Sequence, residues 1–381
     1  MNQIILAFKR DRGTWSAYFM LTFLTLQVSI IGPIMPFLRT EMGLSYTQGA
    51  LHSSAFALGM MAAGFLCGPL ERMVGRKSAM AIAALGLALG FTVIVLARSP
   101  IISIIGTGLM GLIGSMIVVF VPLVLMGIHG NQSDKAISES NLMSYFGALI
   151  APIAVWLVAG NLGWKSVCVI SWLMLAVSAF LIKDAKIPSE TNTSGRTTPP
   201  LGNAYWAYWL LLSISVGIEF CFGVWGASFL EKISGFARDN AILGSTCFSI
   251  GVLSGRFLGI FVIHKIGAWR LTFTSLCIAF VGFFIFWLSW FSILTLFGLA
   301  LSGAGIANLF ATSLTLALST EKENSSKAAA RSSISTGLAI ILTPLLLGAL
   351  ADSVGLFIGY GIVPVLILMG LASLWLGRRL S

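Results

Sequence analysis

Charged residues are scarce in this sequence. Of 381 residues, only 9% are Asp, Glu, Lys or Arg, whereas 57% are hydrophobic. A soluble protein of this size carries roughly a quarter charged residues and covers its surface with them. The mean hydropathy of +0.96 therefore excludes an ordinary water-soluble domain and indicates a protein solvated by lipid.

Cysteine and histidine are also few. The five cysteines all lie inside apolar runs and form no CxxC pair, so neither a disulfide framework nor a zinc site is indicated. The three histidines form no HExxH-type cluster, and we expect no metal and no cofactor. The sequence shows no nucleophile–base pair and no phosphate loop, so we do not expect an enzyme.

Basic residues outnumber acidic ones, and the formal net charge is +10. They are scattered at the ends of apolar runs rather than massed on one segment, so nucleic acid is not an expected partner. Lys and Arg are retained in cytoplasmic loops. With the N-terminus inside, seventeen of them fall in cytoplasmic segments and five in outer loops. We therefore expect a multi-pass protein of a bacterial inner (plasma) membrane with both termini in the cytoplasm.

Long apolar runs are the main feature of the chain. A membrane span needs about 20 apolar residues, and we count twelve: 15–38, 48–70, 78–97, 101–126, 138–158, 164–182, 206–230, 242–263, 270–289, 292–316, 331–351 and 357–376. Residues 183–205 contain many Ser, Thr, Pro and charged residues and are predicted to be a cytoplasmic linker. It separates an N-terminal bundle, 1–182, from a C-terminal bundle, 206–381.

The two halves are related by a repeat. A single offset of 192 residues superimposes them without a gap. It aligns glycines, phenylalanines and a proline from end to end: Gly43 with Gly235, Phe56 with Phe248, Gly75 with Gly267, Pro152 with Pro344 and Gly163 with Gly355. Because each half has an even number of spans, the repeat is parallel, as in transporters built from two related bundles.

The loop between the second and third spans reads "GPLERMVGRK" (Gly68–Lys77) and resembles the signature G-x-L-x-D-R-x-G-R-K of the major facilitator superfamily. Gly68, Gly75, Arg76 and Lys77 match the pattern, as does Leu70. The resemblance implies an all-α membrane fold of 12 transmembrane helices in two pseudo-symmetric six-helix bundles.

The sequence departs from the family pattern in two places. Arg72 stands where the signature has Asp, with Glu71 one residue earlier. The fourth span lacks the arginine typical of many proton-coupled drug exporters. The first two spans are similar to those of fucose-permease-like branches.

Glu219 is an acid in the middle of the seventh span, "GIEFCFGVWG". An acid at that depth costs at least about 2.5–3.5 kcal/mol, so it should face a wet cavity or a partner, or be protonated. Under the offset it falls on Gln27, and the resemblance implies that both line a central cavity and face each other. Trp225 lies one to two turns further on and is expected to stack on a planar or sugar-like solute.

Other polar residues lie inside the spans. Arg256, in the eighth span, has three open roles: pairing with Glu219, binding an anionic group of the solute, or reaching lipid phosphate. Asn141 and Tyr145 are an i, i+4 pair in the fifth span, and Asn308 lies in the tenth. Each of these could equally be a hydrogen-bonding contact between helices, worth about 0.6–2 kcal/mol.

Four charges suggest a cytoplasmic gate. Under the offset Glu139 falls on Arg331, and the family's helix neighbours would bring Glu139 to Lys265 and Arg331 to Glu71, two mirrored pairs with their signs exchanged. We expect these pairs to close the cytoplasmic side and to break when it opens. The alternative is that they are solvated loop charges, which contribute little.

Together, these features predict a secondary active transporter that moves a small organic solute by alternating access, coupled to protons through Glu219. The alternative is a uniporter or a drug or metabolite efflux pump without proton coupling through Glu219. The expected partners are the solute, protons and the lipid bilayer, and the protein is expected to be a monomer.

Overall fold

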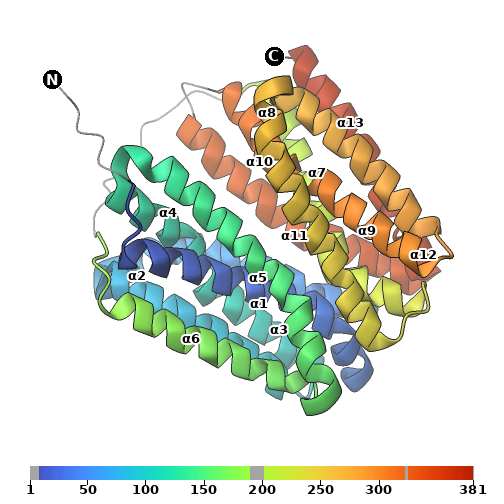
Figure 1. The fold of residues 1–381 in the computed structure, drawn as a ribbon, viewed down its shortest axis with the longest axis horizontal. Helices are drawn as coiled ribbons and strands as arrows, with labels where there is room; N and C mark the ends of the chain where they lie inside the picture. The colour runs from blue at the N-terminus through green and yellow to red at the C-terminus, as the bar shows by residue number, and fades with distance from the viewer. Residues whose placement is uncertain (1–7, 189–200, 322–324, 381) are drawn as a thin grey trace.

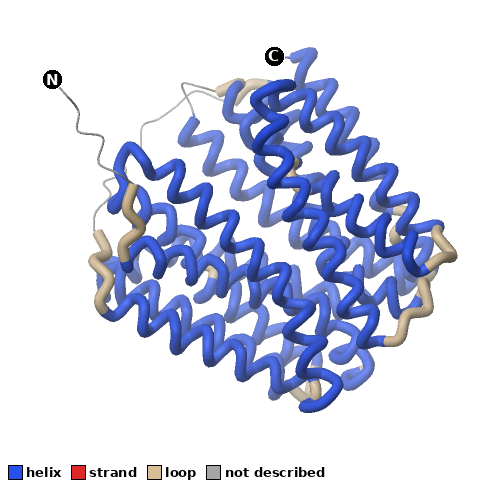
Figure 2. Tube along the Cα trace, viewed as in Figure 1, coloured by secondary structure: helices blue, strands red, loops and turns tan. Residues whose placement is uncertain are grey.

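The computed structural model of the protein describes residues 8–188, 201–321 and 325–380. These residues are mainly helical with short connecting loops, and no strand occurs among them (Figure 2). The helices of the first half are α1 (Arg12–Met42), α2 (Tyr46–Leu96), α3 (Pro100–Leu109), α4 (Met116–His129), α5 (Ser133–Leu162) and α6 (Cys168–Lys183). Those of the second half are α7 (Asn203–Lys232), α8 (Arg238–Leu288), α9 (Ser292–Ile306), α10 (Leu309–Ser319), α11 (Ser325–Val354), α12 (Leu356–Gly359) and α13 (Ile362–Leu380).

The helices form two bundles that lie side by side, α1–α6 and α7–α13 (Figure 1). The predicted all-α, two-bundle fold is confirmed. Because α6 ends at Lys183 and α7 begins at Asn203, we propose the domain division at the predicted linker 183–205, of which 189–200 lie outside the described residues.

Within the described ranges, nine helical stretches are long and apolar enough to cross a membrane. Helices α2 and α8 have 51 residues each, more than twice the length of one crossing. Each turns back at a glycine with positive φ, Gly75 (78°) and Gly267 (79°). A third stretch, Pro100–Gly160, holds α3, α4 and most of α5. If each of these three crosses twice, the structure is consistent with the twelve predicted spans.

The backbone also shows the 192-residue repeat. Three pairs of positive-φ glycines obey the offset: Gly43 with Gly235, Gly75 with Gly267, and Gly163 with Gly355. Close helix packing repeats as well. A Cβ added to Gly59 would lie 2.5 Å from the carbonyl oxygen of Gly108, and one added to Gly251 would lie 1.9 Å from that of Ala300. The two halves therefore share helix contacts as well as span order.

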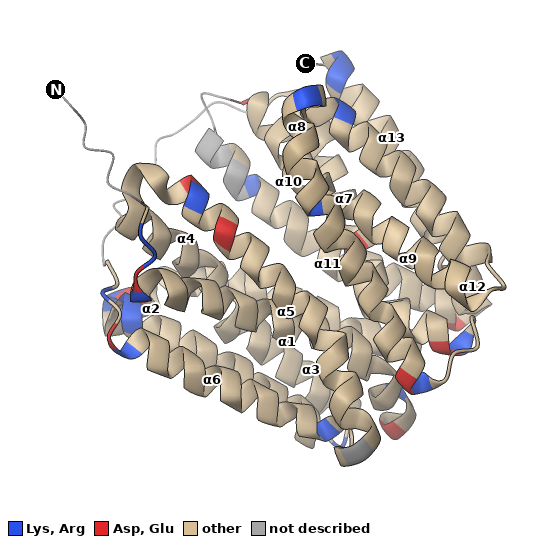
Figure 3. Cartoon of the chain, in the orientation of Figure 1, with Lys and Arg blue, Asp and Glu red and all other residues tan. Residues whose placement is uncertain are grey.

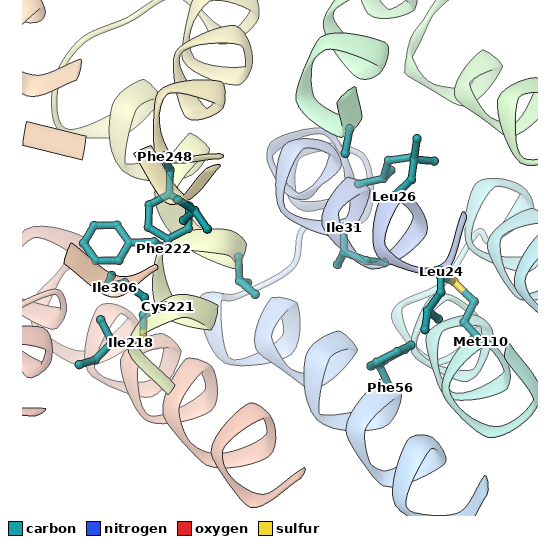
Figure 4. Packing of buried hydrophobic residues seen from close by; sticks show 14 of the residues in the cluster. Leu24, Leu26, Ile31, Phe56, Met110, Ile218, Cys221, Phe222, Phe248 and Ile306 are labelled. Atoms are coloured by element: carbon teal, nitrogen blue, oxygen red, sulfur yellow. The ribbon is translucent and has the colours of Figure 1, made fainter. Parts of the chain in front are cut away.

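The two ends of the molecule are distinct. We call the end that holds the Gly75 and Gly267 turns the linker end, since α6 finishes and α7 begins there, and the opposite end the far end. Figure 3 shows charged residues gathered at the helix ends. Buried apolar side chains form a group in each half, one around Phe222 and Phe248, whose ring centroids are 5.1 Å apart, and one around Leu24 (Figure 4).

The closest contacts between the halves lie in the middle of the molecule and at the far end. A Cβ on Gly32 of α1 would lie 1.8 Å from the carbonyl oxygen of Gly223 in α7, so the two backbones touch. At the far end, Asp352 of α11 accepts hydrogen bonds from the amides of Tyr46 and Thr47 at the start of α2, both at 2.7 Å. The far end is therefore closed in this structure.

Candidate functional site

A cavity of about 240 Å³ lies between the halves, with walls from α1, α2, α5, α7, α8 and α9. One part of its wall is polar and carries Ser144 and Tyr145 of α5, Glu219 of α7, and Ser245 and Ser249 of α8. The rest is mainly apolar, with the rings of Phe56, Phe222 and Phe248. Such a cavity accepts a solute that has both polar and apolar parts.

Glu219 faces this cavity, as predicted. Phe222, Gly223 and Gly226 follow it along the same face of α7, and the absence of a side chain on Gly223 leaves room beside the carboxylate. Among the described residues, Glu219 has no ion-pair partner within 4.0 Å. Of the residues that the structure describes, it is the only acidic one that lines this cavity. The carboxylate is therefore available to a proton or to a cationic group of a solute.

Arg256 is not paired with Glu219 within 4.0 Å in this structure, and its other two roles, toward an anionic solute or lipid phosphate, stay predictions. Its guanidinium lies over the ring of Tyr145, with the central carbon 3.7 Å from the ring centroid, and its Nη2 donates a hydrogen bond to the Tyr145 hydroxyl. Arg256 is in α8 and Tyr145 in α5, so the contact joins the two halves. The Nε atom of Arg256 is buried and has no hydrogen-bond partner among the described residues.

Gln27 does not face Glu219, and this prediction was wrong. It is completely buried, and its amide donates a hydrogen bond to Ser171 of α6 inside the first half. The residues of α1 that line the cavity are those of another face, including Thr25 and Ser29. The offset gives the depth of a residue in the membrane, but the direction of its side chain depends on how each helix is rotated.

Trp225 is not available to stack on a solute in this structure, so that prediction was wrong too. Its side chain is completely buried, and its indole donates to the carbonyl of Pro344 at 3.3 Å. Its ring packs edge-on against Tyr46, with centroids 5.3 Å apart, and against Gly49. Trp225 instead fills the contact between α7 and the start of α2.

The two predicted asparagines lie outside the cavity wall. Asn141 is exposed on α5. The side-chain amide of Asn308 donates to the carbonyl of Gly255 at 2.9 Å and so links α10 to α8 within the second half. For Asn308, the interpretation as a helix-to-helix contact is the one that the structure bears out.

Sequence reasoning missed His52. This side chain is buried at the cavity wall, where its Nε2 lies 2.9 Å from the hydroxyl of Ser103 and its Nδ1 lies 3.1 Å from the carbonyl oxygen of Gly49. The run "HSS" (His52–Ser54), three consecutive polar residues inside an apolar span, could have indicated a polar site at this position. Both ring nitrogens have partners on the first half, so the position of the ring is fixed.

The signature loop is held to the chain that follows α6. Arg76 is only 2% exposed; its Nη2 lies 2.7 Å from the Glu71 carboxylate, and its Nη1 donates to the carbonyl of Pro188 at 2.6 Å. Lys77 donates to the carbonyl of Lys183 at 2.5 Å. Gly68 and Arg72 are exposed. The loop therefore fixes the end of α6 in addition to placing positive charge at this end.

The predicted gate pairs are not formed here. Glu139 is bound by Arg10 at 2.8 Å and by the Tyr18 hydroxyl at 3.0 Å, while Glu71 is bound by Arg76. The hydrogen bonds to Glu139 raise the pKa of Arg10 above its ordinary value. Lys265 and Arg331 are exposed and have no ion-pair partner among the described residues. The pairing stays a prediction for a state in which the linker end is closed.

Several solved structures are similar to this chain. A bacterial homologue of the human lysosomal transporter Spinster, in an inward-facing and occupied conformation, gives a TM-score of 0.82 at 14% identity, over 97% of this chain and 96% of that chain. A D-xylose–proton symporter gives 0.73 at 14% identity, over 95% and 96%. The xylose transporter XylE from E. coli, in a partially occluded inward-open conformation, gives 0.72 at 13% identity, over 97% and 98%.

These likenesses establish the fold. No curated protein sequence matches the chain at a significant level. A family model described as Major Facilitator Superfamily matches residues 17–321, which is most of the chain. The protein is thus a multi-pass membrane protein that belongs to the Major Facilitator Superfamily.

Proposed function

We propose that the protein is a secondary active transporter that moves a small organic solute by alternating access and couples this movement to protons. The observation that carries the proposal is Glu219, a carboxylate without an ion-pair partner among the described residues, in a cavity shared by both halves. When two such halves rock about a site between them, the site is exposed to one side of the membrane at a time.

Glu219 is suited to proton coupling because its surroundings change with the transport cycle. A carboxylate binds a proton when its site excludes water and releases it when water or a cation returns. Tyr145 lines the same cavity as Glu219 and is in contact with Arg256, and Tyr145 and Arg256 come from opposite halves. Rocking of the halves separates or joins these groups, which links proton binding to the conformation of the protein. One similar structure is that of a D-xylose–proton symporter, which supports proton-coupled transport as a function of this fold.

The closed far end supports an inward-facing state. We infer that the linker end is cytoplasmic, because Lys and Arg gather in its segments. In that orientation the solute reaches the cavity from the cytoplasm in this conformation. A bacterial inner membrane and a monomeric protein remain part of the proposal.

A second candidate is uniport or efflux of cationic amphipathic compounds, in which Glu219 recognises charge and carries no proton. The apolar rings of Phe56, Phe222 and Phe248 beside one acid favour such a solute. The absence of an arginine in the fourth span, which many proton-coupled exporters have, also favours a mechanism other than theirs.

The test uses purified protein in liposomes. A thermal-stability screen against sugars, organic acids, nucleosides and amphipathic amines first identifies a solute that stabilises the folded protein. Solute-driven pH change is then measured for the wild type and for Glu219→Gln, with Glu41→Gln at the far end as a matched control. Loss of the pH change in Glu219→Gln alone, with solute exchange retained, supports proton coupling. Absence of a solute-driven pH change in the wild type, with solute binding lost in Glu219→Gln, supports the second candidate. A pH change that Glu219→Gln leaves unaltered removes Glu219 from the mechanism.

A further inference from the structure

A second cavity, of about 740 Å³, lies at the linker end of the second half, away from the Glu219 site. The start of α7 at Asn203 forms one side of it, and the α8 turn at Gly267 with Trp269 and Arg270 forms another. The ends of α10 and α13 complete it, and α13 contributes Arg378. This cavity has no role in the transport mechanism proposed above.

The 192-residue repeat shows what fills the same place in the first half. Ser319, which lines the cavity, corresponds to Gly127. A Cβ on Gly127 would lie 2.7 Å from the Cβ of Pro188, so the chain that follows α6 packs directly there. In the first half this space is therefore filled by the protein itself.

The chain in that space also supplies hydrogen-bond acceptors. Arg76 donates to the Pro188 carbonyl and Lys77 donates to the Lys183 carbonyl. The residue that corresponds to Lys77 is Trp269, which lines the second cavity. In the first half, Arg76 and Lys77 thus donate hydrogen bonds to backbone carbonyl oxygens at and just after the end of α6.

The second half has other cations here, Arg270 and Arg378, and the residues that correspond to the segment after α6 are helical. Helix α13 continues as a helix to Leu380 instead of turning back across the bundle. Arg270 and Arg378 are exposed, and neither has an ion-pair partner among the described residues. Glu321 also lines the cavity, but its carboxylate accepts the amide of Gly202 at 2.6 Å. The cavity wall therefore carries two guanidinium groups, those of Arg270 and Arg378, that have no carboxylate partner among the described residues.

Two helix N-termini at the cavity also favour the binding of an anion there. Helix α7 begins at the cavity, and the second part of α8 begins there after Gly267, so two positive helix ends border it. Guanidinium groups bind phosphate by charge-assisted hydrogen bonds in a geometry that suits both partners. A phosphate group between Arg270 and Arg378 would take the place that the backbone carbonyls have in the first half.

Apolar surface adjoins the cavity, which indicates that the phosphate belongs to a membrane lipid and is not a free ion. The Arg378 guanidinium carbon lies 4.5 Å from the Trp269 ring centroid, and Trp269 packs edge-on against Trp375 at 5.1 Å. Trp375 and Leu376 are 47% and 51% exposed on the outer face of α13. Tryptophan is typical of the membrane–water interface, and basic pockets between helices there bind anionic head groups.

We propose that this cavity binds the head-group phosphate of an anionic phospholipid from the leaflet at the linker end, with its acyl chains along Trp375 and Leu376. The lipid would contact the start of α7, where the linker enters the second half. The proposal depends on the family fold and on the repeat, and it does not depend on Glu219 or on proton coupling.

The experiment uses the full-length protein in neutral detergent. Dioleoylphosphatidylglycerol, dioleoylphosphatidylcholine and inorganic phosphate are titrated separately, and binding is followed by native mass spectrometry and by the melting temperature. We expect phosphatidylglycerol to bind and to raise the melting temperature more than the other two. The double variant Arg270→Gln/Arg378→Gln should weaken this binding at least about tenfold. Arg379→Gln, an exposed neighbour outside the cavity wall, is the matched control and should bind as the wild type does.

Three results would overturn the proposal. They are equal binding of phosphatidylglycerol by the double variant and the wild type, equal binding of phosphatidylcholine, and stabilisation by inorganic phosphate that matches that of the lipid. The first would leave the cavity without a role in lipid binding, the second would remove the preference for an anion, and the third would point to a free anion. If the double variant does not fold, Arg270→Gln and Arg378→Gln are measured singly against Arg379→Gln.

Discussion

Asp352 holds the far end closed, and its removal gives a measurable prediction. Its carboxylate accepts the amides of Tyr46 and Thr47 from the other half, so it caps α2 from across the interface. Loss of such a cap costs about 0.5–2 kcal/mol, and hydrogen bonds to a charged group are worth about 1.5–3 kcal/mol. Ser45 still caps the amide of Gln48 after the change, and water can reach the two freed amides. We therefore expect Asp352→Ala to cost about 1–2 kcal/mol.

A free-energy change of that size lowers the ratio of molecules with a closed far end to molecules with an open far end by a factor of about 5–30. Hydrogen–deuterium exchange measures it directly, because the amides of Tyr46 and Thr47 are protected only while they are bound to Asp352. In Asp352→Ala the peptide that carries them should exchange faster by about that factor. Ser353→Ala is the control, since the Ser353 hydroxyl donates to the Leu350 carbonyl of its own helix and to no other residue in the described part of the chain. Equal exchange rates in Asp352→Ala and the wild type would refute the role of Asp352 in closing this end.

Three further predictions concern the contacts between the halves. Gly32→Ala places a methyl group on backbone of the other half, so we expect transport to fall at least about tenfold, whereas Gly64→Ala, with nothing within 4 Å, should leave it unchanged in the same liposome assay. Trp225→Ala should lower the free energy of unfolding by about 3–5 kcal/mol, read from the melting temperature, because this large side chain is fully buried. If Glu71 and Arg331 pair when the linker end closes, Glu71→Arg with Arg331→Glu should transport better than either single variant, and equal or lower transport would contradict the pairing.

The sequence was sufficient to predict the features that depend on backbone geometry and depth. Gly75 and Gly267 are required where a helix turns back with positive φ, so both the repeat and these two turns could be read from glycine positions. Glu219 was found because a carboxylate in an apolar span is costly unless it faces a polar space.

Side-chain direction and partners could not be predicted in the same way. Gln27 lies two residues after Thr25, which is about 200° around the helix, so one residue faces the cavity and the other faces α6. The contact between Arg256 and Tyr145 joins residues 111 positions apart. It depends on how α5 and α8 are placed against each other, and no local pattern in either helix specifies that.

The touching backbones of Gly32 and Gly223 provide a natural pivot. Glu219 is one helical turn from Gly223, about 6 Å along α7, whereas Asn203 is about 30 Å away. A tilt of about 10° around that point displaces the acid by about 1 Å and the start of the helix by about 5 Å. The carboxylate would stay nearly fixed in the membrane while the openings on either side of it change places.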